Sequence, residues 1–309
     1  MRFFLIRRVL FAFIAVIGAT LIVFALSRAI GDPRYLYLAQ GRFNQQQWDA
    51  LGEELNLDKP LIVQYFIWLG ATSTGDWGKS VYNGRPVTEL IGERIYNTLQ
   101  LGFAAFIFAG FVGVPLGVLS AVKRGSGWDL LSRTFALLGQ AAPPFWLGIM
   151  LILIFAANLN WLPSATKGDG FAIKNFVLPT ITIGWLFASA NLRLVRTSVL
   201  EILDSEFIKL ARAKGLSERR VVWKHAFRNG LIAPLTFAGI NLAALVTGSV
   251  LTETVFAWPG LGRLSINAVY NNDFPVLTGC VLIFTLIYVI ANLLVDIAYA
   301  LLDPRIRYA

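Results

Sequence analysis

Long apolar runs separated by short polar loops are the dominant pattern along this chain. A helix that crosses the hydrocarbon core of a membrane needs about 20 mostly apolar residues. The pattern therefore predicts an all-α membrane protein with six transmembrane helices, because helices satisfy their own backbone hydrogen bonds in lipid. The predicted spans are residues 9–26, 99–122, 130–155, 176–195, 231–255 and 277–302.

The first predicted span follows Arg2, Arg7 and Arg8, an arrangement that a cleaved signal peptide also shows. Its apolar run exceeds the about 7–15 residues that form the core of a signal peptide. We therefore expect this segment to be an uncleaved membrane helix.

Lysine and arginine residues gather in alternate loops. They occur before the first span, at Lys123 and Arg124 after the second, throughout residues 209–228 after the fourth, and in the tail after the sixth. Basic residues in short loops favour the cytoplasmic side. Both termini of this multi-pass chain are therefore predicted to be cytoplasmic. This asymmetry explains much of the net charge of +9, so we expect no nucleic-acid partner.

The segment between the first two spans is too polar to cross a membrane and too patterned for a disordered linker. Residues 47–55 and 60–69 each predict a short amphipathic helix, and residues 75–80 predict turns. We expect a small external helical cap. The predicted parts are residues 1–30 (cytoplasmic stub and first helix), 31–95 (external cap) and 96–309 (a five-helix core with a cytoplasmic loop at about 198–230).

Gly78, Lys79 and Ser80 match the end of a phosphate-binding P-loop. That motif needs a glycine at the position where this chain has Ser73. A P-loop also follows a β-strand, and the residues before Gly78 do not show the pattern of a strand. We therefore reject a nucleotide site here.

The loop after the fourth span predicts two short helices joined by a turn. Ser205 or Asp204 is placed to cap the first helix, Gly215 to end it, and Ser217 to cap the second. Phe207, Ile208 and Leu210 give the loop apolar side chains within a basic rim. This composition is typical of a surface that docks on a protein partner, but also of a basic helix that lies on anionic lipid.

Composition limits the chemistry further. The chain is 56% hydrophobic and only 15% charged, which excludes an ordinary soluble domain. It has one histidine, His225, and one cysteine, Cys280, in different regions. We therefore expect no metal cluster, no catalytic nucleophile–base pair and no internal disulfide.

Several segments resemble a known family. Residues 206–216 (Glu-Phe-Ile-Lys-Leu-Ala-Arg-Ala-Lys-Gly-Leu) resemble the cytoplasmic loop of type I ABC importer permeases of the dipeptide, oligopeptide and nickel class. Residues 225–229, 253–262, 273–275 and 301–305 continue the resemblance. Residues 57–60, 64–65 and 75–80 resemble the external insertion of the first of the two permeases in such systems. The resemblance covers nearly the whole chain.

The resemblance implies a type I ABC importer permease fold in a prokaryotic inner membrane. In this fold the chain forms half of a pathway for peptides or similar solutes. It implies four kinds of partner: a second homologous permease, two ATPase subunits, an external binding protein and membrane lipid. ATP and magnesium would bind to the ATPases, and this chain would bind no cofactor or metal and catalyse no reaction. The residues implied in ATPase coupling are Glu206, Phe207, Leu210, Ala211, Lys214, Gly215 and Leu216.

The sequence departs from the general permease pattern at this loop. That pattern begins Glu-Ala-Ala, and the corresponding residues here are Lys209, Leu210 and Ala211. Arg228 stands where many relatives have proline. Both departures resemble the peptide class, but they argue against any role that needs a carboxylate at position 209.

Polar residues inside membrane spans face a cavity or a partner helix. The candidates for the pathway or a gate are Asn191, Asn241, Ser249 and Glu253, although hydrogen bonding between helices explains most such residues equally well. Pro143 and Pro144 should break or kink the third span. The remaining polar candidates are Gln140, Arg193, Thr247, Thr252, Asn292 and Asp296, and the glycines expected to allow close helix packing are Gly110, Gly113 and Gly117.

Two other functions stay open on the residues alone. A channel or secondary transporter often shows internal repeats and charged groups at the membrane midplane, and a membrane enzyme needs a reactive cluster. Neither feature is visible in this sequence. The substrate also stays open among dipeptides, oligopeptides, nickel chelates, glutathione and glycosides.

Overall fold

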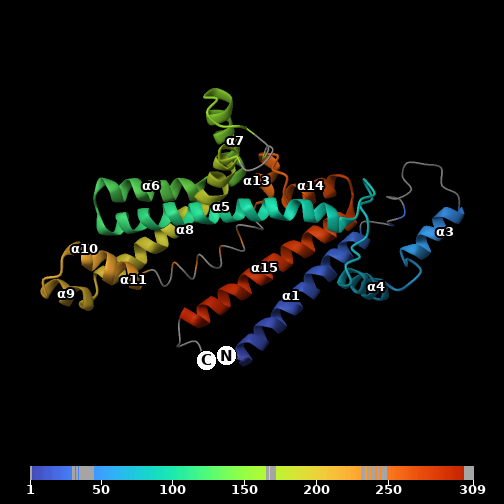
Figure 1. Ribbon diagram of the computed structural model, residues 1–309, viewed down its shortest axis with the longest axis horizontal. Helices are drawn as coiled ribbons and strands as arrows, with labels where there is room; N and C mark the ends of the chain where they lie inside the picture. The colour runs from blue at the N-terminus through green and yellow to red at the C-terminus, as the bar shows by residue number, and fades with distance from the viewer. Residues whose placement is uncertain are drawn as a thin grey trace. The chain divides into compact units, whose positions relative to one another are not determined.

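The computed structural model describes residues 2–29, 45–164, 172–230 and 249–302, together with residues 32, 34, 167, 234, 237, 241 and 244. Every regular element among them is a helix, apart from one isolated bridge between Lys79 and Pro86 (Figure 1). The helices are α1 (Arg2–Ala29), α3 (Gln45–Glu54), α4 (Leu61–Ser73), α5 (Val87–Val122), α6 (Gly127–Ala141), α7 (Pro144–Leu151), the π-helical η1 (Ile152–Asn158), α8 (Ile173–Leu203), α9 (Glu206–Ala213), α10 (Glu218–Arg220), the π-helical η2 (Val221–Ala226), α11 (Phe227–Gly230), α13 (Val250–Val255), α14 (Leu261–Tyr270) and α15 (Phe274–Leu302).

Four described helices are long and apolar enough to cross a membrane, and they match the first, second, fourth and sixth predicted spans. They are α1, α5, α8 and α15, and all four extend beyond the predicted bounds. The second begins at Val87 rather than residue 99, because the helix already starts in the polar residues before the apolar run, where Glu89 lies in its first turn. The fifth predicted span, residues 231–255, lies mostly outside the described residues, which include only its final part as α13.

The third predicted span is not one continuous helix. α6 ends at Ala141, and the next helical pair, α7 and η1, leaves at 108° to it. Pro143 lacks the N–H that would continue α6, and proline disfavours helical geometry in the residue before it. Ala142 accordingly has an extended backbone (φ −80°, ψ 123°), and Pro144 opens the new helix. The predicted break is confirmed, and α6 with α7–η1 can count as a fifth, broken span.

The chain divides into two compact units, residues 1–96 with 260–289, and residues 97–259 with 290–309. In the first unit α1 packs against α4. The hydroxyl groups of Thr20 and Tyr65 are 3.0 Å apart, and Phe24 meets the Tyr65 ring edge-on at 5.6 Å. The two amphipathic helices predicted for the external segment are confirmed as α3 and α4.

The segment that resembled a P-loop is a structural turn in the first unit. The buried Ser80 hydroxyl donates to the Asp273 carboxylate, whose other oxygen accepts the Val81 N–H at 3.2 Å. The Asn83 N–H then donates to the Ser80 hydroxyl at 3.1 Å. Gly78 has φ +77°, which glycine adopts without strain. The serine thus fastens this turn to Asp273 in the same unit.

In the second unit α8 packs against both α5 and α6. A Cβ added to Gly113 would lie 2.5 Å from the backbone oxygen of Ala188, and one added to Gly117 would lie 2.8 Å from that of Leu192. The close packing predicted for these two glycines is confirmed. Among the described residues nothing lies within 4 Å of the missing Cβ of Gly110, so the prediction for that glycine is wrong.

These glycines give a matched pair of substitutions. Gly113→Ala should destabilise the protein by about 1–3 kcal/mol, because the methyl group overlaps the α8 backbone. Gly110→Ala should be neutral or stabilise it by up to about 1 kcal/mol, since alanine is the better helix former. Thermal unfolding of the two variants in detergent measures the difference, and equal midpoints would contradict the packing described here.

Candidate functional site

Residues 204–230, which we call the knob, form two short helical segments at the end of α8 (Figure 1). Ser205 has the extended backbone of a helix-capping residue, and Gly215 ends α9 with φ +77°, as predicted. Ser205 and Ser217 stand at the N-cap positions predicted for them, but their side chains do not make the hydrogen bonds of a cap. The Ser205 hydroxyl donates to the carbonyl of Ile202 at 2.6 Å, and Ser217 makes no capping hydrogen bond. Backbone geometry alone therefore starts both helices.

One side of α9 is fully buried. Ile208 and Ala211, three residues apart and so on one helix face, are 0% and 7% exposed. They join a core with Val221 and Val222 of η2 and with Val199 of α8. The knob is thus held to α8 by an apolar core, and Ala211, a predicted coupling residue, faces that core instead of the surface.

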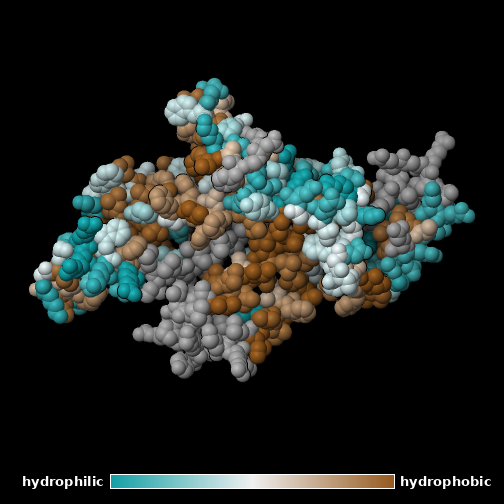
Figure 2. Space-filling model, viewed as in Figure 1, coloured by the Kyte–Doolittle hydropathy of each residue, from teal (hydrophilic) through white to brown (hydrophobic). Residues whose placement is uncertain are grey.

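The other side of α9 presents apolar side chains outward. Phe207 and Leu210 are 46% and 57% exposed. Phe207 also meets His225 of η2 edge-on, with ring centroids 5.6 Å apart. Hydrophilic residues gather around this end of the unit (Figure 2). The exposed apolar pair within a polar rim has the anatomy of a docking surface.

Ion pairs tie the knob together. The Arg212 guanidinium donates to the Glu218 carboxylate at 2.7 Å across the turn, and this hydrogen bond lowers the pKa of Glu218. A lowered pKa means that the pair stabilises the fold above about pH 4.3, the ordinary glutamate value, and that this contribution is lost as the pH falls through the lower value. Glu206 pairs with Lys209 at 2.7 Å. Lys214 is exposed and Leu216 is half-buried.

Glu253, the predicted gate residue, is fully buried in the second unit. Its carboxylate accepts hydrogen bonds from Thr98 at 2.8 Å and from Ser249 at 2.9 Å, and both of these residues are also fully buried. The carboxylate therefore ties α13 to α5. In this structure neither Glu253 nor Ser249 faces open space.

The segment after Glu253 is held by the same part of α5. The Trp258 indole donates to the Asn97 carbonyl at 3.0 Å, and the Asn97 amide donates to the Pro259 carbonyl at 2.8 Å. Trp258 is fully buried and meets Phe176 of α8 edge-on at 4.7 Å. Trp258 thus serves to pack the segment after α13 against α5 and α8.

Each of the two predicted asparagines has a side-chain amide atom without a hydrogen-bond partner among the described residues. Asn191 is buried on α8, and its amide donates to the Ala109 carbonyl at 3.5 Å, the limit for a hydrogen bond. Its side-chain oxygen has no partner within the described residues. The amide nitrogen of Asn241 also lacks one there. Two asparagines with unsatisfied amides remain candidates for contact with water or solute.

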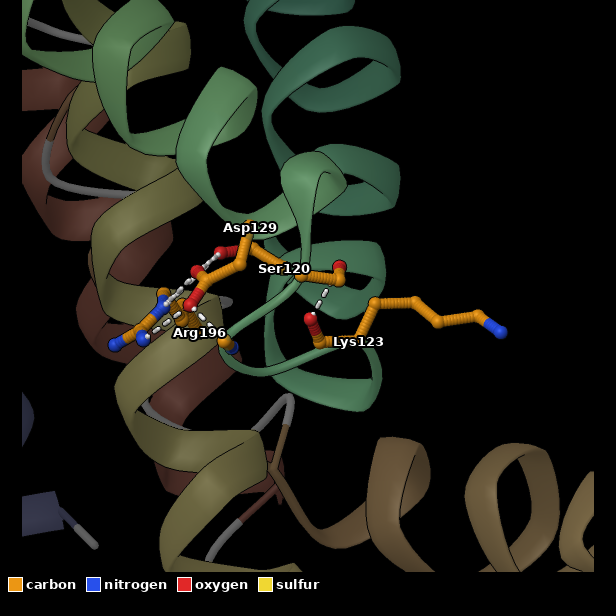
Figure 3. A network of polar contacts seen from close by, with 6 residues as sticks. Ser120, Lys123, Asp129 and Arg196 are labelled. Atoms are coloured by element: carbon orange, nitrogen blue, oxygen red, sulfur yellow. Dashed lines mark hydrogen bonds and ion pairs between the residues drawn. The ribbon is translucent and has the colours of Figure 1, made fainter.

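Sequence reasoning missed one polar network (Figure 3). The Arg196 guanidinium of α8 pairs with the buried Asp129 carboxylate of α6 at 3.0 Å. Asp129 also accepts the Ser120 hydroxyl at 2.5 Å and the Gly125 N–H at 3.0 Å, so α5, its following turn, α6 and α8 meet at one carboxylate. Asp129 and Arg196 each lie just outside a predicted span, and opposite charges flanking two apolar runs are the signal that could have found them.

Comparison with known proteins identifies the relatives of this chain. The model of the family described as binding-protein-dependent transport system inner membrane component matches residues 113–308. The dipeptide transport system permease protein DppB of Escherichia coli (strain K12) is 37% identical over 334 residues, which cover 99% of this chain and 98% of that protein. The oligopeptide transport system permease protein AppB of Bacillus subtilis (strain 168) is 35% identical and covers 99% of both chains.

A solved structure supports the fold. An inward-facing structure of the MetNI methionine ABC transporter contains a chain that superposes with a TM-score of 0.59 at 21% identity. The match covers 70% of this chain and 97% of the other. At this identity the likeness concerns the fold alone, and it places the helical arrangement among ABC importer permeases.

The Asp129 network predicts unequal effects of two aspartate substitutions. Asp129→Asn should destabilise the protein by about 3 kcal/mol, because it leaves the Arg196 charge in a partly buried position without its partner. Asp204→Asn is the control. Its ion pair with Arg124 is 3.8 Å long and largely exposed, so its loss should change stability by less than about 1 kcal/mol. Thermal unfolding in detergent tests both, and similar midpoints would show that the buried pair has no structural role.

Proposed function

The chain belongs to the family of inner membrane components of binding-protein-dependent transport systems, and we propose that it forms half of a pathway that imports peptides or similar small solutes. It is a multi-pass permease subunit of an ABC importer, and it is not itself an enzyme. The peptide substrate rests on the names of two relatives, a dipeptide and an oligopeptide permease that match almost the full chain.

We propose that the complete subunit has six transmembrane helices in a type I importer fold. The described spans and α13 support this count, and residues 231–255 would supply the fifth helix. The three-part division into residues 1–30, 31–95 and 96–309 belongs to the same proposal. Both termini and the knob would then be cytoplasmic, and α3, α4 and the turn at Ser80 would be external.

The partners follow from this arrangement. A second homologous permease would complete the pathway, two ATPases would bind ATP and magnesium below it, and an external binding protein would deliver the solute. Asn191, Asn241, Ser249 and Glu253 are the residues that we propose for the pathway or a gate, the first two through their unsatisfied amides and the last two through the buried contact between α13 and α5.

The knob is the observation that carries the proposal. A docking element that transmits force needs a rigid base and an exposed apolar tip. Ile208 and Ala211 supply the base, and Phe207 and Leu210 supply the tip. We propose that the tip, with Glu206, Lys214, Gly215 and Leu216 around it, sits in a groove of one ATPase and moves when the ATPases close.

Charge introduced at the tip should release the ATPases. The double variant Phe207→Asp with Leu210→Asp should retain at most about a tenth of the ATPase that co-purifies with the parent, since exposed apolar anchors dominate such interfaces. Neither side chain belongs to the buried core, so the variant should still fold and insert.

Tyr82→Asp is the control for this experiment. Tyr82 is 70% exposed in the external segment and undergoes the same kind of change, so ATPase recovery should match the parent. If the double variant keeps both its ATPases and peptide transport, the knob is not a coupling element. A basic helix lying on lipid would then be the better description.

The orientation has its own test. In a Cys280→Ser background, Tyr82→Cys should react with a membrane-impermeant maleimide on intact cells. Lys123→Cys should react only after the membrane is permeabilised, because the proposed topology places it in the cytoplasm. The reverse pattern of labelling would overturn the orientation.

A further inference from the structure

A basic cavity opens between α6, α8 and Phe237 in the second unit. It has a volume of about 570 Å³ and is lined by arginines and leucines from both helices. The arginines are Arg133 on α6 and Arg193 and Arg196 on α8, and the leucines include Leu137 and Leu194. Guanidinium groups and aliphatic side chains in one cavity suit a ligand that is anionic at one end and apolar at the other.

The three arginines differ in how their charge is balanced. Arg196 pairs with Asp129 and is neutralised (Figure 3). Arg193 donates to the Gln140 amide oxygen at 2.7 Å, which orients the guanidinium without cancelling its charge. Arg133 has no ion pair or hydrogen bond within the part of the chain that the structure describes. Among the described residues, two of the positive charges in the cavity therefore have no ion-pair partner.

The position of the cavity along α8 points to the edge of the membrane. Arg193 is 20 residues after Ile173, which at 1.5 Å per residue is about 30 Å, the thickness of the hydrocarbon core. On the proposed topology Arg193 thus lies near the cytoplasmic end of its span, and Arg133 is six residues, about 9 Å, from the cytoplasmic start of α6 at Gly127, so both side chains can extend toward the lipid phosphates. Leu137, 63% exposed, continues the cavity wall as an apolar surface along α6.

We propose that this cavity binds one anionic phospholipid of the cytoplasmic leaflet. Arg133 and Arg193 would hold its phosphate, and Leu137 and Leu194 would contact an acyl chain. Basic pockets between transmembrane helices on this side bind such headgroups. A small peptide also carries a carboxylate and apolar side chains, but the apolar wall continues along α6 as the exposed Leu137, a surface that a membrane lipid would cover, so the observations favour the lipid. The proposal rests on the cytoplasmic placement of the knob, and it adds a lipid site to the transport function.

The experiment uses the whole transporter in nanodiscs of phosphatidylcholine with phosphatidylglycerol as the minor component. Retained phosphatidylglycerol is measured by native mass spectrometry after purification. The double variant Arg133→Gln with Arg193→Gln should retain about tenfold less than the parent, since each basic residue near an anionic lipid contributes substantially to its binding. Recovery of the ATPases with the variant confirms that it is folded.

Lys123→Gln with Arg124→Gln is the matched control, because it removes the same charge from the same side of the membrane outside the cavity. This variant should retain phosphatidylglycerol like the parent. Soluble glycerol phosphate in excess should not displace the lipid, because it lacks the acyl chain.

Equal losses from both double variants would show general attraction to a basic surface and overturn the site. Displacement by glycerol phosphate would assign the cavity to a free anion, and displacement by a dipeptide would assign it to the transport pathway. Peptide uptake by the parent complex is measured separately. It reports on the proposed function whether or not the lipid site exists.

Discussion

The close approach of α5 and α8 is the contact on which the second unit depends. Helices in lipid gain little from burying apolar surface against one another, so they associate through close packing and polar contacts. Gly113 and Gly117 let the two backbones nearly touch. The ion pair between Asp129 and Arg196 binds the first turn of α6 to α8. Because α8 continues directly into the knob, the orientation of the knob follows from this packing.

The proline break plays a complementary part. Without Pro143, α6 would continue as one straight helix, as its apolar pattern predicts. The break turns the chain through 108°, so that α7 leaves the direction of α6. Gly148 of α7 then lies 3.1 Å, at its missing Cβ, from the ring of Phe256 after α13. The two prolines thus redirect the chain so that α7 meets the segment next to Glu253.

Much of the fold could be predicted from the sequence. Apolar length gave four spans, turn residues gave the ends of α9, and the two prolines gave the break. The misses have physical causes. The length of an apolar run does not predict how far a helix extends into polar residues, as the start of α5 at Val87 shows. Regular spacing of glycines does not predict which of them face a neighbouring helix, as Gly110 shows. The sequence also does not predict whether a capping hydroxyl will bond to its helix, because Ser205 donates to the carbonyl of Ile202 in the preceding turn instead.

The site was predictable in location but not in the direction of its side chains. Phe207, Leu210 and Ala211 all belong to one apolar segment, yet only the packing of Ile208 decides that Ala211 faces inward and the other two outward. The same distinction separates the charges on α8. Arg193 and Arg196 look equivalent along the chain, but Asp129 neutralises only one of them. An ion pair that holds the helices together thereby leaves its neighbour charged, and it is this remaining charge that a ligand at the membrane boundary would meet.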